Sequence, residues 1–562
     1  MDRNLLLAFA LSFAVLTLWT MWQEDNYGPG GGLSQQEAVQ GASGGSEPRS
    51  SSGQMAEGEP RRPISPEPGP SSPVQATRAD EVFEEEILEI RRNRYRLELT
   101  NRGAGVRRWI LEDFTDKLGD PIVFTTGEPP HATALLTPLV ELGLGDLSRA
   151  RFQLESDDGD RVVYRLERNG VVIRKIFSFP EDGYEYSLGI EIENGAGVGI
   201  VPQFGVAWPI HAQPAADFKE QGYVVYRDGS VERELLAGVG GSGFLGMGAT
   251  PPTVEYPGNV EWAGVETTYF VGMLLPDDPS NAQARIATWE PSRAGRIQVG
   301  FSPIQIPAGQ RVLREFRGYV GPKETKRLEE LGSGALQAID LGWSWVAPMT
   351  RFFNWLLQSL YQLVPNYGFA IILLTALVRV VTAPLTIRQM RSMERMRALQ
   401  PQLKEIQEKF ADDRQKQSEK TMELYRKEKV NPLGGCLPML LQLPVFIGLF
   451  YALRSSISLR QAPFIGWIHD LSTPESIFTI PGLDLPIRVL PIVMGATMVI
   501  QQRMTPMPSV DPAQARMMQT VMPIMMTVLF YQFASGLVLY WMVSNILAIA
   551  HQRWIGRNLQ QA

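Results

Sequence analysis

The residue whose type and position most clearly indicate a chemical role is Arg379, an arginine near the middle of the apolar run 369–387. Such a run can cross a bilayer as a helix, which takes about 20 residues at a rise of about 1.5 Å each. A cation at that depth costs about 3 kcal/mol on insertion scales, so water, protein or a bound anion must offset it. Three residues share its helical spacing and predict one polar stripe that faces protein or water: Thr375, Thr382 and Thr386.

Arg379 has no acidic partner inside the apolar runs of the sequence. The other polar side chains there are few and neutral, and they include Gln442, Ser544 and Asn545. A structural buried arginine is normally paired, so an unpaired one indicates water or a transient anionic partner. We expect a water-filled cavity open to the cytoplasm. Two alternatives remain: Arg379 reaches the cytoplasmic interface near Pro384, or it donates to backbone carbonyls.

Other kinds of chemistry are poorly represented. Cys436 is the single cysteine, so no intramolecular disulfide can form, and the four histidines show no metal-ligand spacing. No phosphate-binding loop or nucleophile–base motif is present, and a G-x-G-x-x-G match at 238–243 without a βαβ unit favours a flexible loop. The sequence therefore predicts no enzyme, no cofactor and no metal, and its net charge of −7 argues against nucleic acid as a partner.

Six apolar stretches are expected to span a membrane as helices. They lie within 1–25, 366–387, 433–453, 485–502, 517–533 and 537–554. Basic residues gather in 388–430 and after the fourth and sixth spans, which places these segments and both termini in the cytoplasm. The first stretch lacks a small-residue cleavage site and predicts an uncleaved signal anchor, with a cleaved signal peptide as the alternative.

The chain between the first two spans is polar. Residues 26–80 are rich in Gly, Ser, Pro and Glu, which predicts a flexible periplasmic linker. Residues 81–335 contain many short segments of alternating hydrophobicity, and Arg168-Asn169-Gly170 joins two of them as a hairpin. We expect one large antiparallel all-β sandwich domain. Core packing is favoured over a sugar- or peptide-binding cleft for four of its aromatic residues: Trp208, Trp262, Tyr269 and Phe270.

Residues 336–562 are expected to form the membrane core, in which two further helical segments flank the second span. Residues 343–364 are amphipathic and rich in aromatic residues, which predicts a helix lying in the outer interface. Residues 388–430 predict a cytoplasmic helical hairpin of coiled-coil type. Met390, Met393 and Met396 suit the capture of varied apolar substrates, and ordinary coiled-coil packing explains them equally well.

Four stretches resemble the YidC/Oxa/Alb family of bacterial membrane protein insertases. They are 431–438 (NPLGGCLP), 459–463 (LRQAP), 467–471 (WIHDL) and 535–545 (SGLVLYWMVSN). The likeness covers 343–554, and the anchor, acidic linker and β domain resemble the Gram-negative form by architecture. The resemblance implies a polytopic α-helical membrane protein with a five-helix insertase core and a large periplasmic β-supersandwich of sugar-mutarotase-like shape, without catalytic activity.

The resemblance also implies site residues and partners. Arg379 matches the family's groove arginine, Thr375 matches a groove threonine, and Trp541 stands where many relatives have a second tyrosine. We expect the substrate groove, open to cytoplasm and lipid, to be lined by Arg379, Thr375, Thr382, Gln442, Tyr540, Trp541 and Asn545. The implied partners are nascent integral membrane proteins, the Sec translocon with its accessory subunits, and membrane lipids, with the ribosome and the signal recognition particle pathway as further candidates.

The expected function is insertion and folding of inner-membrane proteins, alone or with the Sec translocon, with Arg379 transiently holding the acidic or polar end of a substrate. One alternative is a solute transporter or anion channel that uses Arg379, which predicts inverted repeats that the core spans lack. Another alternative is an envelope sugar enzyme in the β domain. That enzyme would need a carboxylate–histidine constellation, for which the sequence shows no motif.

Overall fold

A computed structural model describes most of the chain between residues 83 and 560. The described residues are 83–116, 119–125, 133–212, 220–236, 238–239, 251–290, 293–411, 413–428, 437–481, 485–504 and 517–560. The expected N-terminal span at 1–25 and the linker at 26–80 therefore lie outside the described residues. The chain forms two compact units, of which one includes Leu399–Lys429 and the other consists of Ala79–Ala398 with Val430–Ala562.

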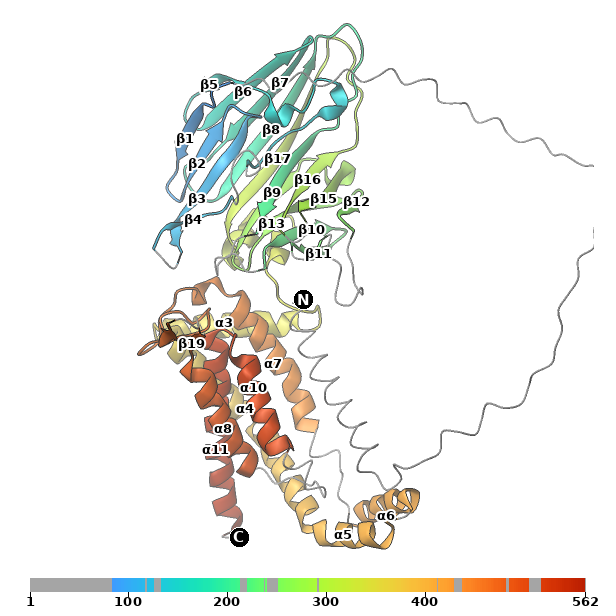
Figure 1. The fold of residues 1–562 in the computed structure, drawn as a ribbon, viewed down its shortest axis with the longest axis vertical. Coiled ribbons are helices and arrows are strands. Elements are labelled where there is room, and N and C mark those ends of the chain that lie inside the picture. Colours follow the sequence, from blue (N-terminus) through green and yellow to red (C-terminus); the bar gives the residue numbers. More distant parts are fainter. Residues whose placement is uncertain are drawn as a thin grey trace, which may run out of the picture. The chain divides into compact units, whose positions relative to one another are not determined.

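Within the described residues, the N-terminal part of the larger unit is an all-β domain built from three antiparallel sheets (Figure 1). The largest sheet has the strand order β11 (Ser230–Leu235), β10 (Gly222–Arg227), β13 (Val260–Glu266), β14 (Phe270–Pro276), β17 (Arg311–Pro322), β8 (Glu185–Asn194), β7 (Val171–Ser178), β6 (Arg161–Arg168), β5 (Gln153–Asp157). The second has the order β12 (Thr253–Tyr256), β15 (Ala282–Glu290), β16 (Ala294–Phe301), β9 (Gly205–His211). The third has the order β1 (Ile87–Arg91), β2 (Tyr95–Thr100), β3 (Gly105–Thr115), β4 (Pro121–Val123). The expected antiparallel β domain is confirmed.

The turn between β6 and β7 shows how a local signal sets the register of two strands. Asn169 and Gly170 have φ angles of 52° and 77°, as a two-residue I′ turn requires and as an Asn-Gly pair tolerates. Arg168 consequently pairs with Val171 across the turn. The hairpin expected at this position is confirmed.

Aromatic side chains fill the interior of the β domain. Trp109, Trp208 and Trp262 are almost completely buried, and so are Tyr269 and Phe270. The rings of Trp109 and Trp208 stack with their centroids 6.5 Å apart. A large aromatic ring buries about 150–250 Å² and so contributes strongly to a core. The burial agrees with core packing, rather than an open cleft, for the four aromatic residues singled out in the sequence.

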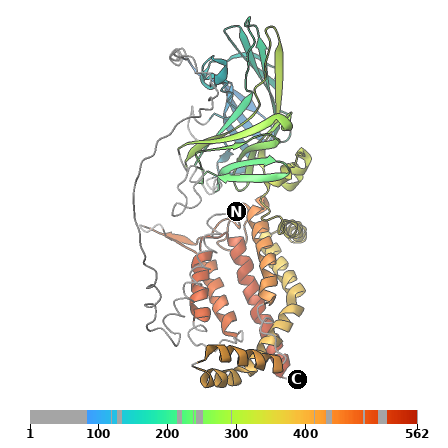
Figure 2. The same cartoon turned by 90° about the vertical axis from the view of Figure 1, so that its right-hand side faces the viewer.

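Helices dominate the rest of the larger unit. They are α2 (Thr325–Leu331), α3 (Ala347–Leu363), α4 (Tyr367–Ala398), α7 (Leu437–Ser455), α8 (Val489–Met504), α10 (Met522–Phe530) and α11 (Ser535–Gln560). Figures 1 and 2 show α4, α7, α8, α10 and α11 side by side in one bundle. Helix α11 packs against both α4 and α8, so it is the element that joins the polar residues described below.

Helix α4 is longer than the expected second span. It runs without interruption from Tyr367 to Ala398, although Pro384 lies inside it and removes one backbone hydrogen bond. The expected start of the helical hairpin at 388 is therefore wrong, because residues 385–398 are mostly good helix formers. The smaller unit contains α5 (Gln400–Lys409) and α6 (Arg414–Lys427), and the Asp413 carboxylate caps α6 by accepting from the Lys416 N–H at 3.0 Å.

Within the described part of the chain, α4 is the one helix long and apolar enough to cross a membrane by length and composition alone. Helix α8 has 16 residues and α10 has 9. At a rise of about 1.5 Å per residue, α8 is about 24 Å long, short of a hydrocarbon core of about 30 Å. The structure therefore supports a helical membrane core but does not establish the expected count of six spans.

The expected fourth span at 485–502 begins too early. Leu485–Ile487 forms strand β19, which pairs antiparallel with β18 (Phe478–Ile480), and α8 begins only at Val489. A short apolar run does not by itself distinguish a strand from a helix, which explains the error. The region of the fifth span begins as a π-helical segment at Met517–Val521, which continues directly into α10 and ends at Phe530.

Candidate functional site around Arg379

Arg379 on α4 is held by a neutral hydroxyl of a neighbouring helix. Its Nε and Nη2 groups donate to the Ser544 Oγ of α11 at 3.1 and 2.6 Å. Among the described residues, no carboxylate forms an ion pair with this guanidinium, and its remaining N–H groups make no hydrogen bond. The side chain is half-buried. A full positive charge therefore faces an uncharged partner, a weaker arrangement than a guanidinium–carboxylate pair.

The three threonines of the α4 stripe bond to their own helix. Thr375, Thr382 and Thr386 each donate to the carbonyl oxygen four residues earlier, at 2.6, 2.9 and 3.2 Å respectively. Such bonds satisfy the hydroxyl proton without water or a neighbouring helix. Thr375 is almost completely buried. The stripe therefore presents hydroxyl oxygens as acceptors, while its protons point along α4.

Helix α11 carries the other polar residues of this region. Tyr540 precedes Ser544 by one turn, so both lie on the same face of the helix, and both are buried. Asn545 donates from Nδ2 to Thr497 Oγ1 of α8 at 3.3 Å, and the Thr497 hydroxyl donates to Met494 O at 2.7 Å. The structure thus links α4 to α11 through a guanidinium–hydroxyl contact and α11 to α8 through a neutral amide–hydroxyl contact.

Two family models together match most of the chain. The one described as 60Kd inner membrane protein matches residues 359–562, and the one described as YidC periplasmic domain matches residues 87–356. A membrane protein insertase YidC from Geobacter sp. (strain M21) is 35% identical over 482 residues, which cover 83% of this chain and 84% of the relative. The chain belongs to the YidC family of membrane protein insertases.

A second relative confirms the YidC assignment over the full length. The insertase YidC of Methylobacillus flagellatus is 32% identical over an alignment that covers 100% of this chain and 98% of the relative. A solved YidC insertase with its first transmembrane domain resolved covers 84% of this chain and 92% of that structure, at 17% identity and a TM-score of 0.34. The assignment therefore rests on the sequence relatives. The resemblance drawn from the motifs is confirmed, and the protein is an inner-membrane insertase with a periplasmic domain.

Trp541 lies in an aromatic cluster of this YidC-family chain rather than against Arg379. Its ring packs edge-on against Phe446 of α7 and Phe530 of α10, with centroid distances of 4.7 and 4.8 Å. These contacts join α11 to α7 and α10, so Trp541 and Arg379 connect α11 to different helices. Gln442 falls on α7, but its side chain lies outside the described residues.

Two of the three methionines expected to capture substrates are buried in this structure. Met390 and Met396 are 9% and 3% exposed, whereas the side chain of Met393 lies outside the described residues. A buried methionine contributes its flexible side chain to packing. This burial agrees with the packing alternative for Met390 and Met396, and substrate capture by them stays a prediction.

Two residues that form this YidC-family site were missing from the expected groove. Ser544 holds Arg379, and Thr497 accepts from Asn545. The signal for Ser544 was its spacing of four from Tyr540 within an apolar run, which places both on one helix face. Thr497 gave a weaker signal, because a lone threonine in an apolar helix usually bonds to its own backbone.

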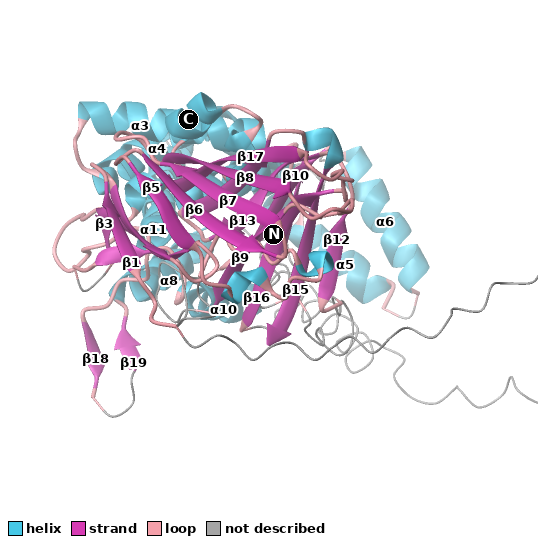
Figure 3. Ribbon diagram, turned by 90° about the horizontal axis from the view of Figure 1, so that it is seen from above, coloured by secondary structure: helices cyan, strands magenta, loops and turns pink. Residues whose placement is uncertain are grey.

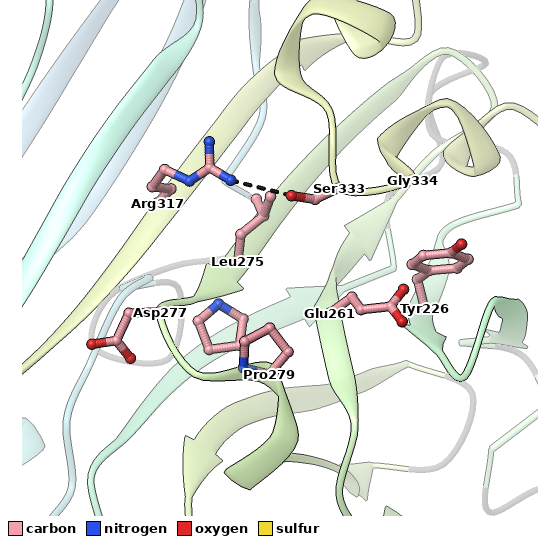
Figure 4. Close-up of a pocket in the computed structure, with 9 residues that line it drawn as sticks. Tyr226, Glu261, Leu275, Asp277, Pro279, Arg317, Ser333 and Gly334 are labelled. Carbon is pink, nitrogen blue, oxygen red and sulfur yellow. Dashed lines mark hydrogen bonds between the residues drawn. The ribbon is translucent and has the colours of Figure 1, made fainter.

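The β domain contains a pocket of ≈ 330 Å³ at the end of β14 (Figure 4). Glu261, Asp277 and Arg317 line it, and Arg317 donates to Ser333 Oγ at 3.1 Å. Burial raises the pKa of the Glu261 carboxyl. None of the described lining residues is a histidine, so this pocket lacks the carboxylate–histidine pair that an envelope sugar enzyme would need.

Proposed function

We propose that Arg379 receives the acidic or polar end of the protein segment that this insertase places in the membrane. The observation that carries the proposal is the contact of a half-buried guanidinium with the neutral Ser544 hydroxyl. A substrate carboxylate would gain charge-assisted hydrogen bonds at this position without having to break an existing ion pair. Between substrates, Ser544 keeps the guanidinium oriented.

The proposed groove extends from this contact along α4 and α11. It comprises Arg379, Thr375, Thr382, Gln442, Tyr540, Ser544 and Asn545, with Trp541 contributing from the adjoining aromatic cluster. The apolar part of a substrate would leave the groove into lipid beside α4, where Val380 and Val381 are each 70% exposed. Transfer of apolar surface out of water supplies the driving force, so the step requires no nucleotide.

The proposed topology follows the distribution of basic residues. Both termini, the hairpin of α5 and α6 and residues 505–516 would lie in the cytoplasm, because Lys and Arg favour that side. The β domain and residues 456–488 would then lie in the periplasm. The Sec translocon, the ribosome and the signal recognition particle pathway are proposed partners, and nascent membrane proteins are the substrates.

The charge at position 379 should control the insertion of substrates that translocate an acidic end. Arg379→Lys should retain most of the activity, because the charge remains. Arg379→Ala should lower the rate by about 10- to 100-fold, since hydrogen bonds to charged groups contribute about 1.5–3 kcal/mol, and Arg379→Glu should lower it further by repulsion. The measurement is the protease-protected fraction of a labelled substrate in vesicles containing the purified full-length protein.

Two controls make this test specific to the proposed contact. Arg388→Ala removes an exposed arginine of the same helix and should leave insertion unchanged. A substrate whose translocated acids are changed to amides should lose its dependence on Arg379. Insertion of the acidic substrate at the wild-type rate by Arg379→Glu would exclude the proposal, and anion flux that depends on Arg379 would favour a transporter.

A further inference from the structure

A short apolar hairpin projects from the helix bundle between α7 and α8. Strands β18 and β19 pair antiparallel with Phe478 opposite Ile487 and Ile480 opposite Leu485. Asp484, between the two strands, is the one charged residue in the sequence from 477 to 487. Figure 3 shows both strands extending beyond the helices, and Ile477 and Phe478 are 46% and 56% exposed. An isolated two-stranded hairpin is marginally stable in water, so this one needs a supporting surface.

The base of the hairpin is fixed to the end of α10. The Tyr531 hydroxyl donates to Pro486 O at 2.5 Å. Arg488 donates to the backbone carbonyl of Tyr531, and its guanidinium lies 5.0 Å from the centroid of the Tyr531 ring. The Ile477 N–H closes the hairpin by donating to Ile487 O at 3.0 Å. The hairpin therefore leaves the bundle at a defined position.

The loop before the hairpin is fixed to the first turn of α8. The Glu475 carboxylate is buried and accepts from the Leu490 N–H and from the Trp467 indole N–H, each at 2.8 Å. Trp467 itself is 39% exposed, and its neighbour Ile465 is 56% exposed. Apolar surface at this end of the bundle is therefore wider than the hairpin alone.

The two helices to which the hairpin base is attached also carry exposed apolar side chains. Ile492 of α8 and Ile524 and Val528 of α10 are 53%, 59% and 69% exposed, as lipid-facing residues of a membrane protein are. Arg488 and Tyr531 stand between this surface and the hairpin. Arginine and tyrosine at helix ends mark the boundary between hydrocarbon and headgroups. The hairpin therefore starts at the depth where the bilayer interface lies.

We propose that the β18–β19 hairpin is a lipid anchor that lies in the membrane interface on the side where α8 begins. Its partner is the headgroup and upper acyl region of the bilayer, into which Ile477 and Phe478 insert. Exposed apolar surface of this kind marks a membrane or protein contact. The attachment of the hairpin to the ends of α8 and α10, which themselves expose apolar residues, favours the membrane. The anchor would hold the start of the short helix α8 at a fixed depth.

The test places an environment-sensitive probe on the hairpin of the full-length protein in phospholipid vesicles. Cys436→Ser removes the single native cysteine, and Phe478→Cys then carries an NBD label. The same label at Asp158→Cys, in an exposed turn of the β domain, is the matched aqueous control. Ile477→Cys repeats the measurement at the residue before β18, so that an effect specific to one substitution can be recognised.

The label at 478 or 477 should emit at shorter wavelength than the label at 158 and should resist quenching by iodide. Spin labels near the lipid headgroup should quench it at least about two-fold more than labels at the chain end, since interfacial elements lie about 5–10 Å deep. Iodide quenching equal to that at 158 would overturn the proposal. A wavelength shift that occurs only after a substrate or protein partner is added, without quenching by lipid labels, would also overturn it and assign the hairpin to protein binding.

Discussion

At the residue scale, Arg379 and Lys175 are cations that donate to neutral groups in different settings. Arg379 donates to a serine between helices, whereas Lys175 lies fully buried in the β domain. The Lys175 Nζ donates to Gly103 O at 3.2 Å and to Leu135 O at 2.5 Å. Both acceptors belong to residues with positive φ. Lys175 thus links two turns of the β domain through hydrogen bonds to their carbonyl oxygens, which is a structural role.

Lys175 should make the stability of the β domain depend on pH. Burial lowers the pKa of its ammonium to about 7, whereas an unfolded lysine titrates at about 10.4. Between these values the unfolded chain binds more protons, so stability rises with pH by up to about 1.4 kcal/mol per unit. Lys175→Met should abolish that contribution. The measurement is urea unfolding of the full-length protein at pH 7, 8 and 9, followed by tryptophan fluorescence.

The matched control for this prediction is Lys326→Met, which removes an exposed lysine of α2. It should retain the wild-type slope of unfolding free energy against pH. Because other groups also titrate above pH 9, the informative quantity is the difference in slope between Lys175→Met and the control. Equal slopes in the two variants would contradict the assignment of the pH dependence to Lys175.

At the element scale, strands β13 and β14 approach each other through glycine. A Cβ atom added to Gly264 would lie 1.8 Å from the carbonyl oxygen of Gly272. A backbone oxygen in a central strand pair cannot move without disrupting the hydrogen bonds of the sheet. A glycine at 189, in β8 of the same sheet, differs because its added Cβ would first meet the Leu313 side chain at 3.2 Å.

Gly264→Ala should therefore destabilise the β domain by at least about 3 kcal/mol, the upper end of the usual cost of overpacking. Gly189→Ala should change stability by less than about 1 kcal/mol, because the exposed Leu313 side chain can rotate away. Urea unfolding of both full-length variants measures the difference. Equal stability of the two variants would contradict this prediction, because it would mean that the β13–β14 pair accommodates a Cβ atom at position 264.

Local sequence signals explain which elements could be predicted from the sequence and which could not. The β6–β7 hairpin was predictable, because Asn169 and Gly170 carry a local signal for positive φ. The division of 485–502 into β19 and α8 was not, because apolar residues suit a lipid-exposed helix and an interfacial strand equally. The continuation of α4 past 388 was missed because a change from apolar to charged residues marks the end of a span but does not end a helix.

The candidate site could be predicted only in part, because local patterns identify single residues but not their partners on other helices. Arg379 is conspicuous because a cation in an apolar run is costly. Its partner Ser544 lies 165 positions away in the chain, and no local pattern pairs residues on two helices. The contacts of the Trp541 ring with Phe446 and Phe530 could not be predicted for the same reason, and its contact with substrate stays a prediction.

At the scale of the whole molecule, the helices of the membrane core have unequal lengths. Helix α4 has 32 residues, whereas α8 has 16. Helix α8 is therefore about 24 Å long, against a hydrocarbon core of about 30 Å. Lipid beside a short helix thins to match it, at a cost of fractions of a kcal/mol per Å. A thinner bilayer beside α8 would shorten the path that the polar end of a substrate must cross.

Insertion should therefore slow several-fold when the protein is reconstituted in bilayers of about 33 Å core thickness instead of about 27 Å, because more mismatch must be overcome around α8. The measurement is the initial rate of protease protection of one substrate in the two kinds of vesicle at equal protein content. Vesicles without protein give the spontaneous rate, which is subtracted. If the protein-dependent rate were the same in both bilayers, or higher in the thicker one, the short helices would serve packing and not the passage of substrate.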